Sequence, residues 1–261
     1  MIHAVARVDL NCDAGEGYGP WRMGDDEALL DLVTTVNVAC GLHAGDPLIM
    51  ARTVRLAHRR GVAVGAHPGP NDLWGFGRRD VSHEPPADLA TLVAYQVGAL
   101  QAVAAQEGAR VLSVKLHGAL SGAAAVDATL AGAVARTIRA VDPALVWLVP
   151  ASSAMVAAGR AAGLRVAEEV FADRAYTREG TLVSRAVPGA VIDDPAQCAE
   201  RAVRMVVDGM ATSADGVRIA LRADSLCVHG DTPNAVAAAR AIREALRAAG
   251  VEVAPLARVL A

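Results

Sequence analysis

The sequence predicts an α/β fold in which seven parallel strands close into a (β/α) barrel. Short β-rich runs alternate along the chain with longer Ala-, Leu- and Arg-rich segments of helical period. This alternation requires right-handed crossovers and therefore a parallel sheet. Ionisable residues follow strand after strand at the C-terminal end, whereas an open sheet would concentrate them at one switch point. A ring of such strand ends favours a barrel over a doubly wound sheet.

Each expected strand is a short β-rich run that ends in polar residues. In order they are RVDLNCD (7–13), TTVNVAC (34–40), VAVGAHP (62–68), VLSVKLHG (111–118), LVWLVP (145–150), RVAEEVFAD (165–173) and SLCVHGD (225–231). Helices are expected between and after them, at 25–33, 47–60, 87–107, 127–140, 152–162, 195–209 and 233–249. Asp46-Pro47, Asp194-Pro195 and Thr232-Pro233 suit an N-cap followed by proline in the first helical position. We expect the stretch 173–194 to be a long active-site loop. We expect residues 1–261 to form a single domain.

Composition excludes several classes of protein. The chain has 261 residues, 53% hydrophobic and 3% aromatic, so it can bury a large core of small aliphatic side chains. Its net charge of −3 gives no attraction to nucleic acid or anionic lipid. The uncharged window 89–106 contains three glutamines and falls short of the ~20 apolar residues of a membrane span. Asp9 and Asp13 interrupt the N-terminal apolar stretch, so we expect no export signal and a cytoplasmic location.

The four cysteines carry no metal or redox pattern. Cys12, Cys40, Cys198 and Cys227 form no CxxC pair, so we expect buried or pocket-lining thiols. The motif GEGYG (15–19) follows a strand, but its spacing is not that of a dinucleotide site, and Asp13 and Glu16 would repel a pyrophosphate. A Walker A loop is excluded because it needs Gly-Lys. If ATP is used, its site is not recognisable from the sequence.

Polar residues at the strand ends are the candidates for chemistry. Grouped by strand, they are Asp9, Asn11, Asp13 and Glu16; Asn37, His43 and Asp46; His67 and Asp72; Lys115 and His117; Glu169, Asp173 and Arg174; His229 and Asp231. Four of the seven histidines belong to this set, whereas His3, His58 and His83 are expected to be peripheral. Any one of these histidines could simply cap a loop or helix, but together they predict a site at one barrel mouth.

Lys115 is the only lysine, against 24 arginines. A lysine on a buried strand fits a compact ammonium that stabilises a developing oxyanion or phosphoryl group, a role for which the planar guanidinium is no equivalent. The alternative is a structural side chain whose stem packs and whose amine reaches solvent. Arg78 and Arg174 lie beside aromatic residues in predicted loops and suit a carboxylate, whereas Arg79 is expected to form an ordinary loop salt bridge.

Three short motifs pair an imidazole with a nearby carboxylate: HAGD (43–46), HPGPND (67–72) and HGD (229–231). Either the acid orients the ring, or both ligate a metal ion. Metal-dependent deacetylases use one Asp and two His at strand ends, so Asp13, His43 and His67 are a conceivable divalent-cation site. The metal itself is left unassigned.

The chain resembles the LamB/YcsF-like family, whose members are now called the A subunit of 5-oxoprolinase. The matching stretches are DLNCDAGEGYG (9–19), NVACGLHAGDP (37–47), GAHPGPNDLWGFGRR (65–79), YQVGAL (95–100), VKLHGAL (114–120), EEVFADRAYTREGTLVSR (168–185) and CVHGDTPNAV (227–236). The family pattern KPHGALYN reads KLHGALSG here, with Leu116, Ser121 and Gly122 in place of Pro, Tyr and Asn. The resemblance implies a seven-stranded irregular (β/α) barrel of the glycoside hydrolase/deacetylase type.

The resemblance also implies ATP-dependent opening of 5-oxo-L-proline (pyroglutamate) to L-glutamate, together with partner subunits B and C. On that basis Lys115 is expected to stabilise the charged oxygen, and Asp13 or His67 to deprotonate water. His117, or His229 oriented by Asp231, is expected to protonate the ring nitrogen. The remaining expected site residues are His43 among the catalytic groups and Asn11, Glu16, Arg78, Glu169 and Arg174 around the substrate. Replacing Lys115 by Met is expected to stop the chemical step and leave the fold intact.

Two other functions remain open at this point. A stand-alone metal-dependent amidohydrolase or deacetylase would bind metal tightly and act without nucleotide. A non-catalytic subunit would capture the lactam or dock onto partners while catalysis occurs elsewhere. The density of ionisable groups at one mouth exceeds what a simple small-ligand site needs and argues against the second.

Overall fold

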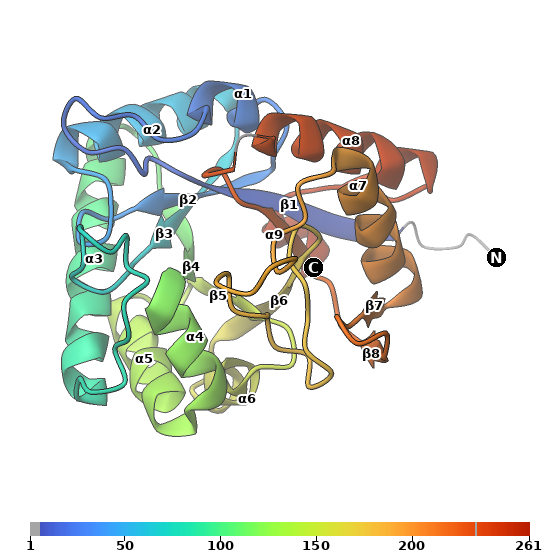
Figure 1. The fold of residues 1–261 in the computed structure, drawn as a ribbon. Coiled ribbons are helices and arrows are strands. Elements are labelled where there is room, and N and C mark those ends of the chain that lie inside the picture. Colours follow the sequence, from blue (N-terminus) through green and yellow to red (C-terminus); the bar gives the residue numbers. More distant parts are fainter. Residues whose placement is uncertain (1–5, 233) are drawn as a thin grey trace.

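The computed structural model describes residues 6–232 and 234–261 and contains the predicted closed barrel (Figure 1). Its strands are β1 (Arg7–Ala14), β2 (Thr35–Ala39), β3 (Ala63–His67), β4 (Val111–Lys115), β5 (Val146–Pro150), β6 (Arg165–Phe171) and β9 (Ser225–Val228). Consecutive members of this series pair in parallel, and β9 closes the ring by pairing with both β6 and β1. The prediction of seven parallel strands in a barrel is therefore confirmed.

Helices surround the strands on the outside (Figure 1). Those predicted from the sequence are α1 (Asp26–Leu30), α2 (Pro47–Arg60), α3 (Pro86–Gln106), α5 (Ala128–Val141), α6 (Ala154–Ala161), α7 (Pro195–Val203) and α8 (Ala235–Ala248). Asp46 and Asp194 cap α2 and α7 through backbone N–H groups of the first turn, as predicted. The third expected pair includes Pro233, which lies outside the described residues, and α8 has Asn234 as its N-cap.

The structure also contains elements that were not predicted from the sequence. They are α4 (Gly118–Val126), the antiparallel hairpin of β7 (Met210–Thr212) and β8 (Arg218–Ala220), β10 (Glu252–Val253) beside β1, and α9 (Leu256–Val259). The expected strand 111–118 is too long, because β4 stops at Lys115 and Gly118, with φ +57°, begins α4. The expected helix 195–209 ends as α7 at Val203 and continues as a π-helical turn, η1 (Arg204–Asp208).

Side chains alternate between two environments along the barrel strands. On β1, Val8, Leu10 and Cys12 belong to the main apolar core, which also takes in residues from the surrounding helices, whereas Asp9 and Asn11 form polar contacts with other strands. A separate apolar cluster joins residues of β5 and β6 to α9, namely Val146, Leu148, Ala167 and Leu256. The barrel interior therefore contains this apolar cluster in one layer and polar side chains such as Asp9 and Asn11 in other layers. Layered filling of this kind is typical of barrel interiors.

Helix α3 is the one described helix that is long and apolar enough, by length and composition, to cross a membrane. Its buried residues, including Leu89, Val93 and Leu100, form one packed set within the main core. Gln96 on the same helix is fully buried and bonds both backbone groups of Gly69. These contacts are those of a helix packed on a barrel.

Asp9 is a fully buried carboxylate in the barrel interior. The hydroxyls of Thr34, Thr35 and Ser225 donate to it, but burial dominates and raises its pKa to about 6. Between pH 4 and 6 the folded state therefore keeps a proton that the unfolded state has lost, so this group lowers the free energy of unfolding as pH rises.

We expect Asp9→Asn, which stays neutral, to gain stability relative to the wild type as pH increases from 4 to 7. A pKa near 6 against an unfolded value of 3.8 corresponds to roughly 3 kcal/mol. Urea denaturation of both proteins at several pH values measures this difference. A difference that stays constant over the range would contradict the raised pKa.

Candidate functional site

A cavity of about 540 Å³ opens among the C-terminal ends of the barrel strands. Its lining includes Asp13 from β1, His67 from β3, Lys115 from β4, and Glu169 and Phe171 from β6. Segments after the strands complete the wall, among them residues 116–126, 150–153, 180–185, His229 and Asp231. The predicted convergence of strand ends on one mouth is therefore present in the structure.

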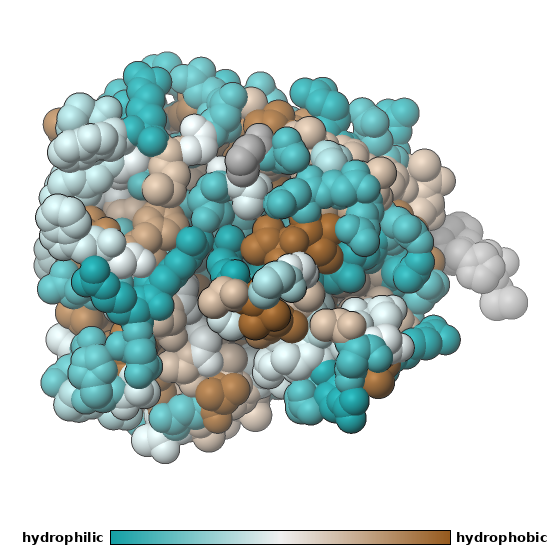
Figure 2. Space-filling view, in the orientation of Figure 1, coloured by the Kyte–Doolittle hydropathy of each residue, from teal (hydrophilic) through white to brown (hydrophobic). Residues whose placement is uncertain are grey.

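The cavity wall mixes charged and apolar side chains. Leu116, Val126 and Val183 lie in the same lining as Lys115 and Glu169. The molecular face in Figure 2 likewise shows hydrophobic side chains near its centre, surrounded by hydrophilic ones. Such a wall can exclude water while a few polar groups orient a ligand. Ser121 and Gly122, which replace the Tyr and Asn of the family pattern, also lie on this wall, so smaller side chains border the cavity at these positions.

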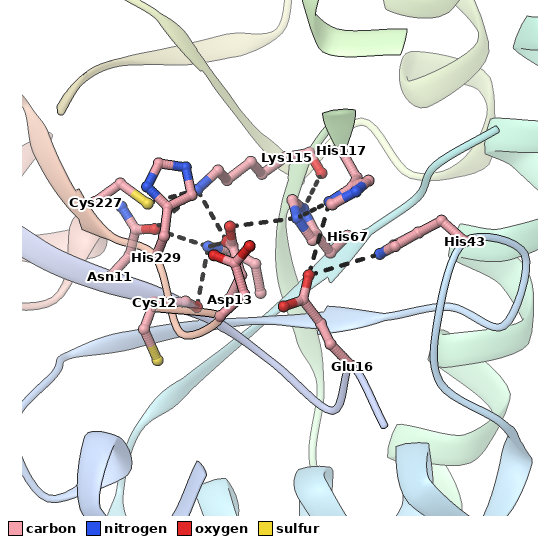
Figure 3. A network of polar contacts seen from close by, with 12 residues as sticks. Asn11, Cys12, Asp13, Glu16, His43, His67, Lys115, His117, Cys227 and His229 are labelled. Atoms are coloured by element: carbon pink, nitrogen blue, oxygen red, sulfur yellow. Dashed lines mark hydrogen bonds and ion pairs between the residues drawn. The ribbon is translucent and has the colours of Figure 1, made fainter. Parts of the chain in front are cut away.

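The ammonium of Lys115 is the centre of the polar network (Figure 3). Its Nζ lies 2.9 Å from Asp13 Oδ1 and 3.0 Å from Glu169 Oε1, and it donates to Cys227 Sγ at 3.0 Å. The side chain of Asn11 joins the same group, because its amide donates to Glu169 and its oxygen lies 3.3 Å from Nζ. The alternative in which the amine reaches solvent is wrong, since Lys115 is only 5% exposed.

Neighbouring charges determine the protonation states of Lys115 and Asp13. Burial by itself disfavours the ammonium, but Asp13, Cys227 and Glu169 raise the pKa of Lys115 well above its usual range. Burial likewise raises the pKa of Asp13, yet His67 and Lys115 lower it well below its usual value. Asp13 is thus an ionised carboxylate held against a permanent cation.

Three imidazoles lie beside this group. His67 donates from Nδ1 to the Lys115 carbonyl at 2.8 Å, and His117 donates from Nε2 to the Phe76 carbonyl at 2.8 Å. The remaining nitrogens, His67 Nε2 and His117 Nδ1, lie 3.0 Å apart. His43 stacks on His117 with ring centroids 3.8 Å apart. Burial lowers the pKa of His43 well below its usual range and that of His117 to about 3.

Glu16 approaches the imidazoles from the segment after β1 (Figure 3). Its Oε1 lies 3.7 Å from His117 Nδ1 and 3.8 Å from His43 Nε2. Burial, Asp13 and Asp231 raise the pKa of Glu16 well above its usual value. Glu16, His43, His67 and His117 are close enough to bind one metal ion, and Asp13, Cys227 and His229 form a second such group. The conceivable set of Asp13, His43 and His67 is thus divided between two groups.

The expected local pairing of imidazole and carboxylate is wrong for all three motifs. His229 Nδ1 bonds Asp173 Oδ2 at 2.6 Å, whereas Asp231 pairs with Arg78 at 2.6 Å. Asp46 is occupied as the N-cap of α2. Asp72 accepts from the Gly75 N–H and pairs with Arg79, which confirms the loop salt bridge expected for that arginine. The carboxylates nearest His67 and His43 come instead from β1 and the segment after it.

The cationic side of the cavity contains one residue that was not predicted from the sequence. Arg174 donates to the carbonyls of Ala190 and Val183, and Arg78 is held by Asp231. Arg185, which also lines the cavity, lies 3.8 Å from Asp231. Arg185 is the last residue of the matching stretch 168–185 and lies in the long loop 173–194, and these were the signals that could have pointed to it. All four cysteines are free and buried, as predicted.

The fold and the site together define a parallel β/α barrel with a polar site at the C-terminal mouth, where barrel enzymes carry their active sites. Within this class the chain belongs to the LamB/YcsF family, whose model matches residues 8–261. A 5-oxoprolinase A subunit of Rhodopseudomonas palustris (strain BisA53) is 59% identical over 254 residues, which are 97% of this chain and 100% of that relative. The 5-oxoprolinase A subunit of Nitrobacter hamburgensis is 54% identical over 95% of this chain and 97% of its own length.

Two solved structures share the fold of this chain. The lactam utilization protein of Thermus thermophilus superposes with a TM-score of 0.89 at 48% identity, covering 95% of this chain and 99% of that one. A T48 deacetylase structure matches with a TM-score of 0.51 at 13% identity, covering 98% of this chain and 90% of its own. This second likeness concerns the fold alone and confirms the expected deacetylase-type barrel.

The structure changes the expectation that Lys115→Met leaves the fold intact. Methionine at this position would leave Asp13 and Glu169 buried without their cation, which costs roughly 3–5 kcal/mol for a broken buried pair. We expect a loss of that size in urea denaturation. The double variant Lys115→Met/Glu169→Gln should be more stable than the single Lys115→Met, because one of the stranded charges is removed. Equal stability of wild type and Lys115→Met would show that the ion pairs contribute nothing to the fold.

Proposed function

We propose that this chain, as a single barrel domain, is the A subunit of a cytoplasmic ATP-dependent 5-oxoprolinase that opens 5-oxo-L-proline to L-glutamate together with subunits B and C. The proposal rests on the side chains that meet in one cavity and on the match to named relatives. A single cavity collects an ammonium, an ionised carboxylate, a paired imidazole and guanidinium groups, and the chain matches relatives named as A subunits of 5-oxoprolinase over almost its whole length.

The chemistry of the lactam explains the need for ATP. A five-membered lactam is a resonance-stabilised amide, so water attacks its carbonyl carbon slowly. Transfer of the γ-phosphoryl group to the lactam oxygen makes that carbon electrophilic and releases ADP. Addition of one water and cleavage of the C–N bond, with a proton passing to nitrogen, leaves an acyl phosphate. A second water then releases inorganic phosphate and L-glutamate.

Lys115 and Asp13 suit the first part of this sequence. The ammonium of Lys115 is fixed in a buried position beside the cavity and can stabilise negative charge on the lactam or phosphoryl oxygens. Asp13 is ionised, and its Oδ2 is not engaged with Lys115 and lies 3.5 Å from His67 Nε2. That oxygen can accept a proton from the attacking water. Lys115 is thus assigned as the electrostatic group and Asp13 as the base.

The acid that protonates the ring nitrogen is best supplied by His229. Its Nδ1 bonds Asp173, and the ring stacks on Phe171 with centroids 5.6 Å apart. The other ring nitrogen is then available to the cavity that His229 lines. Burial would raise the pKa of Asp173, but the hydrogen bond and charge of His229 lower it below its usual value, so the orienting group is a carboxylate. Asp173 takes the role that the sequence assigned to Asp231.

The substrate carboxylate is expected to bind on the arginine side of the cavity. Arg78 is the better candidate, because its partner Asp231 is a side chain that a substrate carboxylate can replace. Arg174 has two donors committed to backbone carbonyls and is better suited to shaping the loop. The small lactam fills only part of a 540 Å³ cavity, which leaves space for a phosphoryl group.

We expect the purified chain to release glutamate from 5-oxo-L-proline and ATP only when subunits B and C are added. Glutamate and inorganic phosphate, measured with and without the partners, test this directly. Glutamate release by the chain alone without nucleotide would instead indicate a stand-alone amidohydrolase. Full activity of the complex after Asp13→Asn would place catalysis on one of the partners and reduce this chain to a binding role.

We expect Asp173→Asn to lower kcat of the reconstituted complex by roughly 10²-fold or more, because His229 loses its orienting carboxylate. The matched control is Asp231→Asn, which removes a carboxylate that lines the cavity and bonds Arg78 rather than His229. It should change KM through Arg78 and leave kcat within a few-fold. A large kcat loss in the Asp231 variant with none in the Asp173 variant would show that Asp231 orients His229, as the HGD motif suggests.

A further inference from the structure

Two imidazoles of the cavity have their tautomers fixed by backbone carbonyls. A carbonyl oxygen only accepts, so the bonds to the carbonyl oxygens of Lys115 and Phe76 place the N–H on Nδ1 of His67 and on Nε2 of His117. With one proton on each ring, the other nitrogen carries a lone pair. These two lone pairs face each other across 3.0 Å.

Two lone pairs at this distance repel unless a cation lies between or beside them. A shared proton is one solution, and a metal ion is the other. Zinc–nitrogen distances of about 2.0–2.1 Å with angles between 90° and 109° place two nitrogens roughly 2.8–3.4 Å apart. The 3.0 Å separation of His67 Nε2 and His117 Nδ1 lies within this range and is also that of an N–H···N hydrogen bond.

The groups around the pair decide between a proton and a metal. Both ring nitrogens of His43 are buried and have no hydrogen-bond partner within the part of the chain that the structure describes. Its Nδ1 side packs on Gly69, where a Cβ would lie 2.4 Å from the nitrogen, so Nε2 is the atom near Glu16. A single proton between His67 and His117 leaves Glu16 Oε1, 3.7 Å from His117 Nδ1, outside that bond. A divalent cation can bind the two facing nitrogens and Glu16 Oε1 together.

We propose that His67 Nε2, His117 Nδ1 and Glu16 Oε1 bind one divalent first-row transition-metal ion. Two imidazoles and one carboxylate suit zinc and its neighbours rather than magnesium or calcium, which prefer oxygen. The carbonyls of Lys115 and Phe76 accept from the far side of both rings and fix their orientation, as backbone carbonyls commonly do for metal-binding histidines. His43 stacks face to face on His117, so its in-plane lone pair does not point at an ion bound by His117, and its contribution is to hold that ring in place.

The proposed ligands are not the groups assigned to the reaction, but the two sets adjoin each other. Asp13 Oδ1 is committed to Lys115 and Asn37 and His229 to Asp173, whereas Asp13 Oδ2 lies 3.5 Å from His67 Nε2. Metal binding by the isolated chain requires neither lactam nor nucleotide. Its outcome is therefore independent of whether the chain is part of a 5-oxoprolinase.

The test uses the full chain, stripped with a chelator and titrated with Zn²⁺ and then Co²⁺. We expect one ion per chain by calorimetry and elemental analysis, a visible d–d absorption of bound Co²⁺, and a Tm that rises with metal concentration. His67→Ala and His117→Ala should each weaken binding by at least about 100-fold, more than the loss of a group that only orients a ligand. His43→Ala should weaken it less.

Two control variants make the result specific. His58→Ala removes an exposed histidine of α2 and should leave one ion bound with unchanged affinity. Cys227→Ala tests the neighbouring group of Asp13, Cys227 and His229 and should also retain the ion. Loss of metal in the Cys227 variant with retention in the His67 and His117 variants would overturn the assignment. Absence of any metal-induced rise in wild-type Tm, with no Co²⁺ spectrum, would mean that a shared proton joins the two rings.

Discussion

One buried ammonium organises the polar interior of this barrel. Lys115 stands on β4, whose neighbours in the sheet are β3 and β5, yet its contacts are with Asp13 on β1, Glu169 on β6 and Cys227 on β9. The side chain therefore crosses the barrel and joins strands that backbone hydrogen bonds do not connect to β4. A buried charge is tolerated only when it is paired, so these partners and the lysine must be kept together.

The geometry of this network explains why an arginine-rich chain keeps one lysine. An ammonium presents three donors around a single nitrogen, and Asp13, Glu169 and Cys227 lie about 3 Å from it. A guanidinium spreads its donors over a planar fork and does not place three of them around one point.

The barrel and the convergence of several strand-end side chains on one cavity were predictable from the sequence, because both follow from local patterns. The alternation of strands and helices is visible within short windows, and parallel strand ends must meet at one mouth. The pairing of those residues was not predictable in the same way. His229 bonds a carboxylate 56 positions away rather than two, because the barrel brings β6 beside β9 while Asp231 is drawn to Arg78. Helix α4 was missed because its sequence, GALSGAAAV, is almost entirely apolar and so has no amphipathic period, although its alanines favour a helix.

The two halves of the site are linked through Lys115 and Asp13. The Lys115 side chain holds Asp13 ionised, and its carbonyl fixes the His67 ring, which in turn lies against Asp13. Glu16 is only three residues from Asp13, but burial together with Asp13 and Asp231 raises its pKa, and Arg78 offsets this only in part. A metal ion among the imidazoles would lower that pKa and add positive charge beside Asp13. The charge state of the imidazole half therefore sets how strongly Asp13 can act as a base, so neither half can be altered without changing the other.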